Sequence, residues 1–215
     1  MNIRIWIQGL TLCCLTIQSH AQGTITFTFD GPPSVPGPGL PGPGQSFYVQ
    51  QYSEAGMWFR PLGVIAPGNG FSRQRGGGQL SFAPDNGSAF IATVLGDSLQ
   101  FSFTNGSSFN MVAVDLAEYS AVVSNAVTVP FYGYRADGSV VFTSFTTDGI
   151  IDGAGPLADF QTFYFGPEFS NLLRVEIPTF GWSLDNLVVS VPEPGLGALL
   201  MLAAAGFWLG RKPRE

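Results

Sequence analysis

The stretch FYGYRADGSVVFTSF, residues 131–145, decides the fold class of this chain. Two runs rich in aromatic and β-branched residues flank the triplet Ala136-Asp137-Gly138. Aspartate tolerates the left-handed backbone conformation and glycine adopts it freely, so an Asp-Gly pair between two such runs is typical of a tight turn. The stretch therefore predicts an antiparallel β-hairpin.

The same pattern of short strand-like runs and turn pairs continues along the chain. TITFTFDG, residues 24–31, places Ile25, Phe27 and Phe29 on one face of a strand and threonines on the other. Further candidate strands are residues 47–52, 57–59, 80–82, 89–95, 99–104, 111–116, 127–134, 140–145, 160–165, 172–177 and 183–190. Asn-Gly or Asp-Gly pairs occur at residues 69–70, 86–87, 105–106, 137–138, 148–149 and 152–153. Short strands without helical periods between them predict an all-β fold, an antiparallel, jelly-roll-like β-sandwich.

The composition agrees with one such domain. Of 215 residues only 11% are charged, whereas 28 are glycine and 16 are proline. This balance suits short strands and tight turns better than long exposed helices. Residues 32–45, PPSVPGPGLPGPGQ, combine the two residue types, and we expect them to form an extended surface loop.

The N-terminus has the three parts of a secretory signal peptide. Arg4 precedes an apolar run from Ile5 to Ile17, and Ser19-His20-Ala21 supplies the small-x-small pattern that precedes a cleavage point. We therefore expect residues 1–21 to be removed between Ala21 and Gln22. An N-terminal core helix and a lipoprotein signal using Cys13 or Cys14 are the alternatives.

Removal of residues 1–21 takes away both cysteines and the only histidine of the chain. The mature protein then has no thiol nucleophile, no Ser-His-Asp triad, no histidine base and no zinc site of the Cys/His type. Between Gln22 and Val191 there are five arginines and no lysine against 13 acidic residues, a formal charge of 5 − 13 = −8. This charge disfavours nucleic acid as a partner. We expect Arg73-Gln74-Arg75, flanked by glycines, to be solvated loop charges.

The C-terminal tail is apolar and then basic. Gly195 to Gly210 is a run of sixteen residues without a charge. As a helix it would rise about 24 Å, somewhat less than the hydrocarbon thickness of about 30 Å. Its large apolar residues lie all around the helical wheel and predict a hydrophobic membrane helix: Leu196, Leu199, Leu200, Leu202, Phe207, Trp208 and Leu209. The basic residues Arg211, Lys212 and Arg214 follow at once and are expected to stay on the cytoplasmic side.

The tail resembles the PEP-CTERM protein-sorting signal, because Val191-Pro192-Glu193-Pro194-Gly195, an apolar helix and a basic cluster occur in that order at the chain end. The resemblance implies recognition of Pro192, Glu193 and Pro194 by an exosortase-type transpeptidase in the inner membrane of a Gram-negative bacterium. The tail would then be removed and the protein transferred to the cell surface or extracellular matrix. The two prolines are expected to keep the tripeptide out of any sheet. A permanent C-terminal anchor is the alternative. The predicted domains are a signal peptide (1–21), a β-sandwich ectodomain (22–190) and a sorting signal (191–215).

The ectodomain resembles galactose-binding-type carbohydrate modules at its two ends, FTFDG at residues 27–31 and FGWSLDNLVV at residues 180–189. In such sandwiches the first and last strands tend to be neighbours, which would bring Asp30 close to Asp185 and Asn186. Oxygen ligands of this kind suit Ca²⁺, so a structural calcium site is one prediction. Hydrogen bonds from these side chains to local backbone are the alternative.

Two further sets of residues suggest chemistry. Asp115 and Glu118 could be the paired carboxylates of a glycosidase. Asp148 and Asp152 are spaced like two ligands of a calcium loop, and two β-turns are the alternative explanation of this stretch. Aromatic residues near loops could stack on sugar rings, with Trp58 the preferred candidate. These residues are Tyr48, Tyr52, Trp58, Tyr119, Tyr132, Tyr134, Tyr164 and Trp182.

The leading hypothesis is a non-enzymatic exported surface or matrix protein. A carbohydrate-binding module for exopolysaccharide is the first alternative, and a glycoside hydrolase that uses only carboxylates is the second.

Overall fold

The computed structural model describes residues 22–32, 39–62, 70–77, 82–93, 98–120, 125–150 and 159–192. The predicted signal peptide, Glu193, Pro194, the apolar helix and the basic cluster lie outside these residues. The candidate strand at residues 80–82 is described only at Phe82, which lies in a turn. Within the described ranges, no helix has the length and apolar character needed to cross a membrane.

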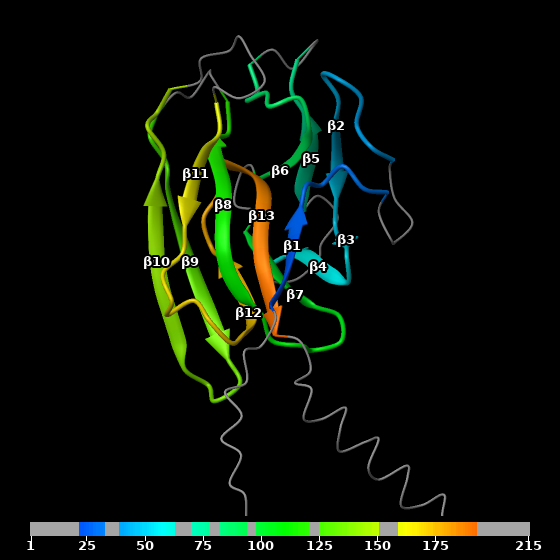
Figure 1. Cartoon of the computed structure of the whole chain (residues 1–215). Coiled ribbons are helices and arrows are strands. Elements are labelled where there is room, and N and C mark those ends of the chain that lie inside the picture. The colour runs from blue at the N-terminus through cyan, green and yellow to red at the C-terminus, as the bar shows by residue number, and fades with distance from the viewer. Residues whose placement is uncertain are drawn as a thin grey trace, which may run out of the picture. The chain divides into compact units, whose positions relative to one another are not determined.

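The described strands form two antiparallel sheets. The seven-stranded sheet has the order β11 (Gln161–Tyr164), β8 (Asn110–Glu118), β13 (Trp182–Pro192), β6 (Ala89–Ala92), β5 (Phe71–Arg75) and β2 (Ser46–Val49), and β1 (Gln22–Phe27) also pairs with β13. The six-stranded sheet has the order β10 (Val140–Thr146), β9 (Thr128–Arg135), β12 (Leu172–Ile177), β7 (Leu99–Phe103), β4 (Met57–Pro61) and β3 (Tyr52–Glu54). The sheets pack as a sandwich (Figure 1), so the all-β antiparallel prediction is confirmed.

The hairpin predicted at residues 131–145 is present as β9 and β10. Its register pairs Tyr134 with Val140 and Tyr132 with Phe142. Gly138 has a φ of 82°, which is the left-handed conformation that the turn requires, and the carboxylate of Asp137 accepts a hydrogen bond from the backbone of Ser139 at 2.9 Å.

Period-two alternation supplies the main core between the sheets. In β4, for example, Met57, Phe59 and Pro61 are buried, whereas Trp58 and Arg60 between them are partly exposed. Phenylalanine rings fill much of the space, and Phe59 contacts Phe27 and Phe101 with ring centroids 5.5 and 5.6 Å apart. A second, smaller cluster consists of Ala83, Phe90 and Ala92, with Tyr119 and Phe160 packed against it.

The first and last strands are neighbours, as the resemblance to galactose-binding-type modules implied. The β1–β13 ladder runs from Phe27 opposite Leu187 to Gln22 opposite Pro192 (Figure 1). The expectation that Pro192 stays outside a sheet is therefore wrong. It is the last residue of its strand, where the missing amide hydrogen of proline is tolerated. Gln22–Pro192 is one compact unit that contains the entire main core, so this segment has the burial needed to fold by itself.

Arg73 corrects another expectation. The sequence suggested solvated charges in a glycine loop, but Arg73 and Gln74 lie in β5, and the side chain of Arg73 is only 1% exposed. Its Nε donates to the carbonyl of Phe29 at 2.6 Å, and its Nη2 donates to the same carbonyl and to that of Gly31. The guanidinium also lies 4.9 Å from the ring centroid of Tyr52. An inward position of this strand is therefore occupied by an arginine, which satisfies carbonyls in the turn that follows β1.

Candidate functional site

The outer face of the six-stranded sheet carries a continuous group of aromatic and polar side chains. Alternation in each strand turns one set of residues into the core and the other set outward. We define the aromatic face as ten of the outward residues of β4, β7, β9, β10 and β12, those in two adjacent rows across the sheet: Trp58, Arg60, Gln100, Ser102, Tyr132, Tyr134, Val140, Phe142, Arg174 and Glu176.

Strand register arranges these residues in rows across the sheet. One row reads Arg60, Gln100, Glu176, Tyr132 and Phe142, each paired with the next on the adjacent strand. It crosses five strands, and four strand spacings of 4.7–4.9 Å make it about 19 Å long. A second row lies two residues along the strands. It contains Trp58 opposite Ser102 at one side and Arg174, Tyr134 and Val140 at the other.

Aromatic rings lie near both sides of the face. The rings of Tyr132 and Phe142 are 5.0 Å apart, and Phe142 is 56% exposed. Val140, next to Phe142 on β10, is also exposed. A large apolar side chain on a bare sheet surface forgoes the free energy of burial, so a group of them indicates a surface that binds a partner.

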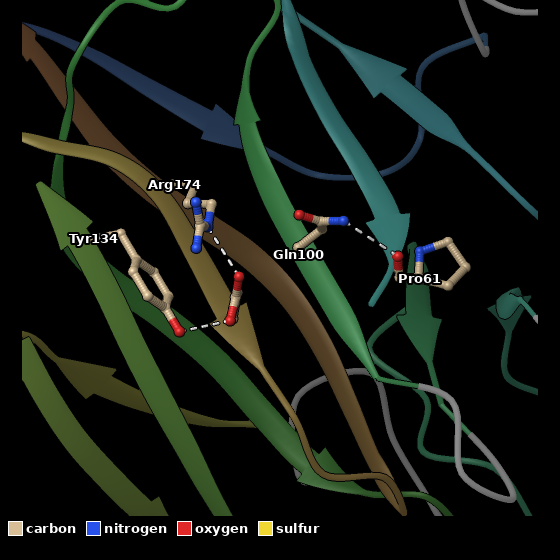
Figure 2. Close-up of polar contacts among 5 residues, drawn as sticks. Pro61, Gln100, Tyr134 and Arg174 are labelled. Atoms are coloured by element: carbon tan, nitrogen blue, oxygen red, sulfur yellow. Dashed lines mark hydrogen bonds and ion pairs between the residues drawn. The ribbon is translucent and has the colours of Figure 1, made fainter. Parts of the chain in front are cut away.

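A hydrogen-bonded network occupies the middle of the face. The guanidinium of Arg174 lies 3.9 Å from the ring centroid of Tyr134, and its Nε donates to Glu176 Oε1 at 2.9 Å. The hydroxyl of Tyr134 donates to Glu176 Oε2 at 2.7 Å. This hydrogen bond to a carboxylate raises the pKa of the Tyr134 hydroxyl. Figure 2 shows Arg174 beside Tyr134.

Two further contacts, separate from this network, lie on β4 and between β7 and β4. Gln100 Nε2 lies 3.4 Å from the carbonyl oxygen of Pro61, a long hydrogen bond that orients the amide (Figure 2). The guanidinium of Arg60 lies 5.0 Å from the ring centroid of Trp58. Contact with an aromatic ring restricts the conformations of both arginines, and the side chain of Arg174 is 46% exposed.

The aromatic residues predicted to stack on sugars lie in different parts of the structure. Tyr52 and Trp182 are fully buried in the core, which corrects their inclusion among residues that could stack on sugars. Tyr119 packs on the smaller cluster. Tyr48 and Tyr164 are exposed, but they belong to β2 and β11 of the seven-stranded sheet. Trp58, Tyr132 and Tyr134 are the members of that group that share the aromatic face.

The predicted calcium ligands Asp30, Asp185 and Asn186 each form hydrogen bonds within the protein. Asp30 Oδ1 accepts a hydrogen bond from the backbone of Ala89 at 2.9 Å. Asp185 is fully buried, and its Oδ2 accepts from Asn86 Nδ2 and from Ser88 Oγ. Burial raises the pKa of Asp185 to about 7, and the nearby charge of Asp30 adds to the increase.

Asn186, the third predicted ligand, has a φ of 43° at an irregularity in the β13–β8 register, and its Nδ2 donates to Asp115 Oδ2 at 2.8 Å. In the described part of the chain, no three acidic, histidine or cysteine side chains are grouped so that they could hold a metal ion. Asp30 is close enough to Asp185 for its charge to affect the pKa of that carboxyl. The calcium site itself stays a prediction.

The structure does not bring Asp115 and Glu118 together as a catalytic pair. They are three residues apart in β8, so their side chains leave opposite faces of the strand. Asp115 accepts hydrogen bonds from Thr162 and Asn186, while buried Glu118 accepts one from the Gly149 amide at 2.7 Å. Two carboxylates so placed cannot flank one glycosidic bond.

Asp148 also has a local role, since its Oδ1 accepts from the Ile150 amide at 2.9 Å in a turn. Asp152 lies outside the described residues.

No protein-family model matches the chain, and no curated protein matches it. Among solved structures, the chain is similar to a family 11 carbohydrate-binding module from Clostridium thermocellum in complex with a β-1,3-1,4-mixed-linked tetrasaccharide. The sequences are 11% identical, the match covers 66% of this chain and 87% of that chain, and the TM-score is 0.26. A likeness of this size assigns neither a family nor a ligand.

Proposed function

We propose that the ectodomain binds a polysaccharide through the aromatic face. The observation that carries this proposal is the combination, on one sheet surface, of an exposed ring, Phe142, three partly exposed rings and a hydrogen-bonded group of polar side chains. Phe142 and Tyr132 offer apolar ring surfaces on which sugar rings can stack, whereas the guanidinium of Arg60 lies over the ring of Trp58. Arg174, Glu176 and the other polar members offer donors and acceptors for sugar hydroxyls.

The dimensions of the face suit an extended chain. The row from Arg60 to Phe142 is about 19 Å long at ordinary strand spacing, so it is long enough for several sugars rather than one. The order of side chains along the row also favours a glycan over a protein partner. Its polar residues, Arg60, Gln100 and Glu176, occupy one end and the centre, and its aromatic residues the other end, whereas protein interfaces usually place apolar side chains at the centre.

The test is affinity electrophoresis of residues 22–192 through gels that contain a series of neutral and acidic polysaccharides. We expect retardation by at least one of them and loss of that retardation in Phe142→Ala combined with Tyr132→Ala. The matched control is Tyr164→Ala, which removes an even more exposed ring, 73% exposed, from the other sheet and should leave binding unchanged. Retardation by none of the polysaccharides, or equal retardation of all variants, would contradict the proposal.

We further propose that the protein is exported and sorted by its tail, and that the polysaccharide is therefore outside the cell. The support comes from the signal-peptide pattern of residues 1–21 and the sorting-signal pattern of residues 191–215, together with the boundaries of the compact unit between them. The compact unit begins at Gln22 and ends at Pro192, so removal of residues 1–21 and of the tail after Pro192 leaves in place the core residues that the structure describes. An exosortase-type enzyme would act at Pro192, Glu193 and Pro194 while the apolar segment is in the inner membrane.

Mass spectrometry of the mature C-terminus tests this second proposal. In a host that contains the sorting enzyme, we expect a C-terminus close to Pro194 and surface or matrix localisation. Recovery of intact Arg214 and Glu215 from the cytosol would overturn it. The jelly-roll-like connection of the strands, the C-terminal helix and the absence of enzymatic activity stay predictions from the sequence.

A further inference from the structure

We propose that the polysaccharide bound by the aromatic face is acidic, with the carboxylates of uronic acid units paired to Arg60 and Arg174. This inference rests on the proposed carbohydrate function and concerns the chemical class of the ligand. The positions of the five arginines of the ectodomain, and the groups that each of them contacts, lead to it.

The five arginines of the ectodomain have different roles. Arg73 is buried and bonded to backbone carbonyls. Arg75 donates to the carbonyl of Gly87 at 2.7 Å, and Arg135 donates to the carbonyls of Ser170 and Glu168. These three stabilise turns and strand ends.

The remaining two, Arg60 and Arg174, are both on the aromatic face. Glu176 is the one acidic residue among the ten residues of this face, so its formal charge is 2 − 1 = +1. The ectodomain as a whole has a charge of 5 − 13 = −8. The aromatic face thus has a net positive charge on a strongly negative domain. A neutral glycan needs no such excess, because hydroxyl groups are satisfied by neutral donors and acceptors.

The two arginines still have donors for a ligand. Among the described residues, the single ion pair is that of Arg174 with Glu176, so Arg60 has no carboxylate within ion-pair distance. Arg174 uses Nε for Glu176, and its side chain is 46% exposed. A guanidinium has five N–H donors in a planar fork that matches the two oxygens of a carboxylate. Both forks are held over aromatic rings, Trp58 and Tyr134, which limits the entropy lost when a carboxylate binds.

The positions of the two arginines suit a repeating anion. Arg60 is on β4 and Arg174 is on β12, with β7 between them, and they belong to different rows of the face. A chain that crosses the strands obliquely can therefore meet both. The Debye length is about 8 Å at physiological ionic strength, so these local contacts outweigh the distant negative charges of the domain.

The experiment measures binding of residues 22–192 to polygalacturonate and to alginate, each compared with its neutral ester, by isothermal titration calorimetry. We expect each acidic polymer that binds to do so at least about tenfold more tightly than its ester, because esterification removes the charge-assisted hydrogen bonds. Binding of the acidic polymer should weaken as salt is added, whereas binding of an ester should not.

Three variants locate the effect. Arg60→Gln should weaken binding of the acidic polymer about tenfold, the loss of about one charge-assisted hydrogen bond. Arg75→Gln changes the total charge by the same amount away from the face, so it should leave affinity unchanged. Glu176→Gln removes the acid of the face and should strengthen binding of the acidic polymer, which a purely structural role of Glu176 does not predict. Cooperative melting of each variant confirms that it is folded.

The outcomes separate this inference from the proposed function. Equal affinity for acid and ester, or binding only of neutral polysaccharides, would overturn the acidic ligand while the carbohydrate function stands. If no acidic or neutral polysaccharide binds, both fall. Equal weakening by Arg60→Gln and Arg75→Gln would show a general charge effect and would also overturn the assignment to this face.

Discussion

Three arginines of the ectodomain lie over aromatic rings, one in the interior and two on the aromatic face. Arg73 lies 4.9 Å from the ring centroid of Tyr52, Arg174 lies 3.9 Å from that of Tyr134, and Arg60 lies 5.0 Å from that of Trp58. The local contact is the same in each case. The surroundings differ, and they decide whether the guanidinium stabilises the fold or is available to a ligand.

In the interior, the protein itself uses the donors of the arginine. Arg73 donates to the carbonyls of Phe29 and Gly31, and Phe29 has a φ of 56°, an unusual value for a residue with a side chain. Burial lowers the pKa of Arg73, while the neighbouring groups Tyr52 and Glu54 act in the opposite direction. Hydrogen bonds from the Phe29 amide and the Tyr52 hydroxyl to Glu54 complete the cluster. The arginine thereby fixes the turn that follows β1.

The largest effect that we predict is for Arg73→Met. Methionine keeps much of the apolar volume but removes the arginine donors of the Phe29 and Gly31 carbonyls and the cation near Glu54, so that among the described residues Gly31 keeps only the long contact from the Tyr52 hydroxyl at 3.4 Å. Breaking a buried charged network in this way typically costs about 3–5 kcal/mol of unfolding free energy. Urea unfolding of residues 22–192 measures it.

The control for that variant is Arg75→Met, two residues along β5. Its guanidinium donates to the single carbonyl of Gly87 near the surface, so the expected loss is about 1 kcal/mol or less. A similar loss for both variants would show that the buried position of Arg73 has no special role.

The second prediction concerns Asp185, a buried acid that forms no ion pair with an arginine among the described residues. Its carboxyl has a pKa of about 7 in the folded state against 3.8 for the ordinary group, chiefly because it is buried. Between these values the folded protein keeps a proton that the unfolded chain has lost. The contribution of Asp185 to stability is therefore greatest in mild acid and falls as the pH rises from about 4 to about 7, by up to about 4 kcal/mol.

Melting temperatures measured from pH 5 to pH 8 check this. Asp185→Asn should flatten the decrease, whereas Asp137→Asn, in the exposed hairpin turn, should leave it unchanged. A wild-type melting temperature that rises over this range would contradict the assignment. Calcium added at pH 8 tests the metal prediction, because binding to Asp30 and Asp185 would raise the melting temperature and Asp185→Ala would abolish the increase.

Local sequence patterns were sufficient for most strands and insufficient for β5. The hairpin at residues 131–145 follows from alternation around an Asp-Gly pair, and those two signals act on adjacent residues. FSRQR, residues 71–75, has no apolar alternation because its inward residue is Arg73, whose partners at Phe29 and Gly31 are more than 40 residues away. A strand that contains a buried charged residue is thus predicted as a loop when the distant hydrogen-bond partners of that residue are unknown.

The aromatic face was predictable only in part for the same reason. Residue type alone identifies Tyr132, Tyr134 and Trp58 as candidates. It does not identify Arg174 and Glu176, although their spacing of two in a strand indicates one shared face. The missing information was the register that places β12 between β7 and β9, since strands distant in sequence are aligned by tertiary packing.

The smallest effect that we predict is for Arg174→Gln on stability. The pair of Arg174 with Glu176 is solvent-exposed on the arginine side, and its stacking on Tyr134 adds a contribution of the size found at surfaces. Together these contacts should contribute about 0.5–1 kcal/mol to the unfolding free energy, several times less than those of Arg73. A double-mutant cycle with Tyr134→Leu, followed by urea unfolding, measures the stacking part. If Arg174→Gln destabilised the domain as much as Arg73→Met, the arginines of the aromatic face would be part of the fold like the interior one, and the contrast that assigns them to a ligand would be lost.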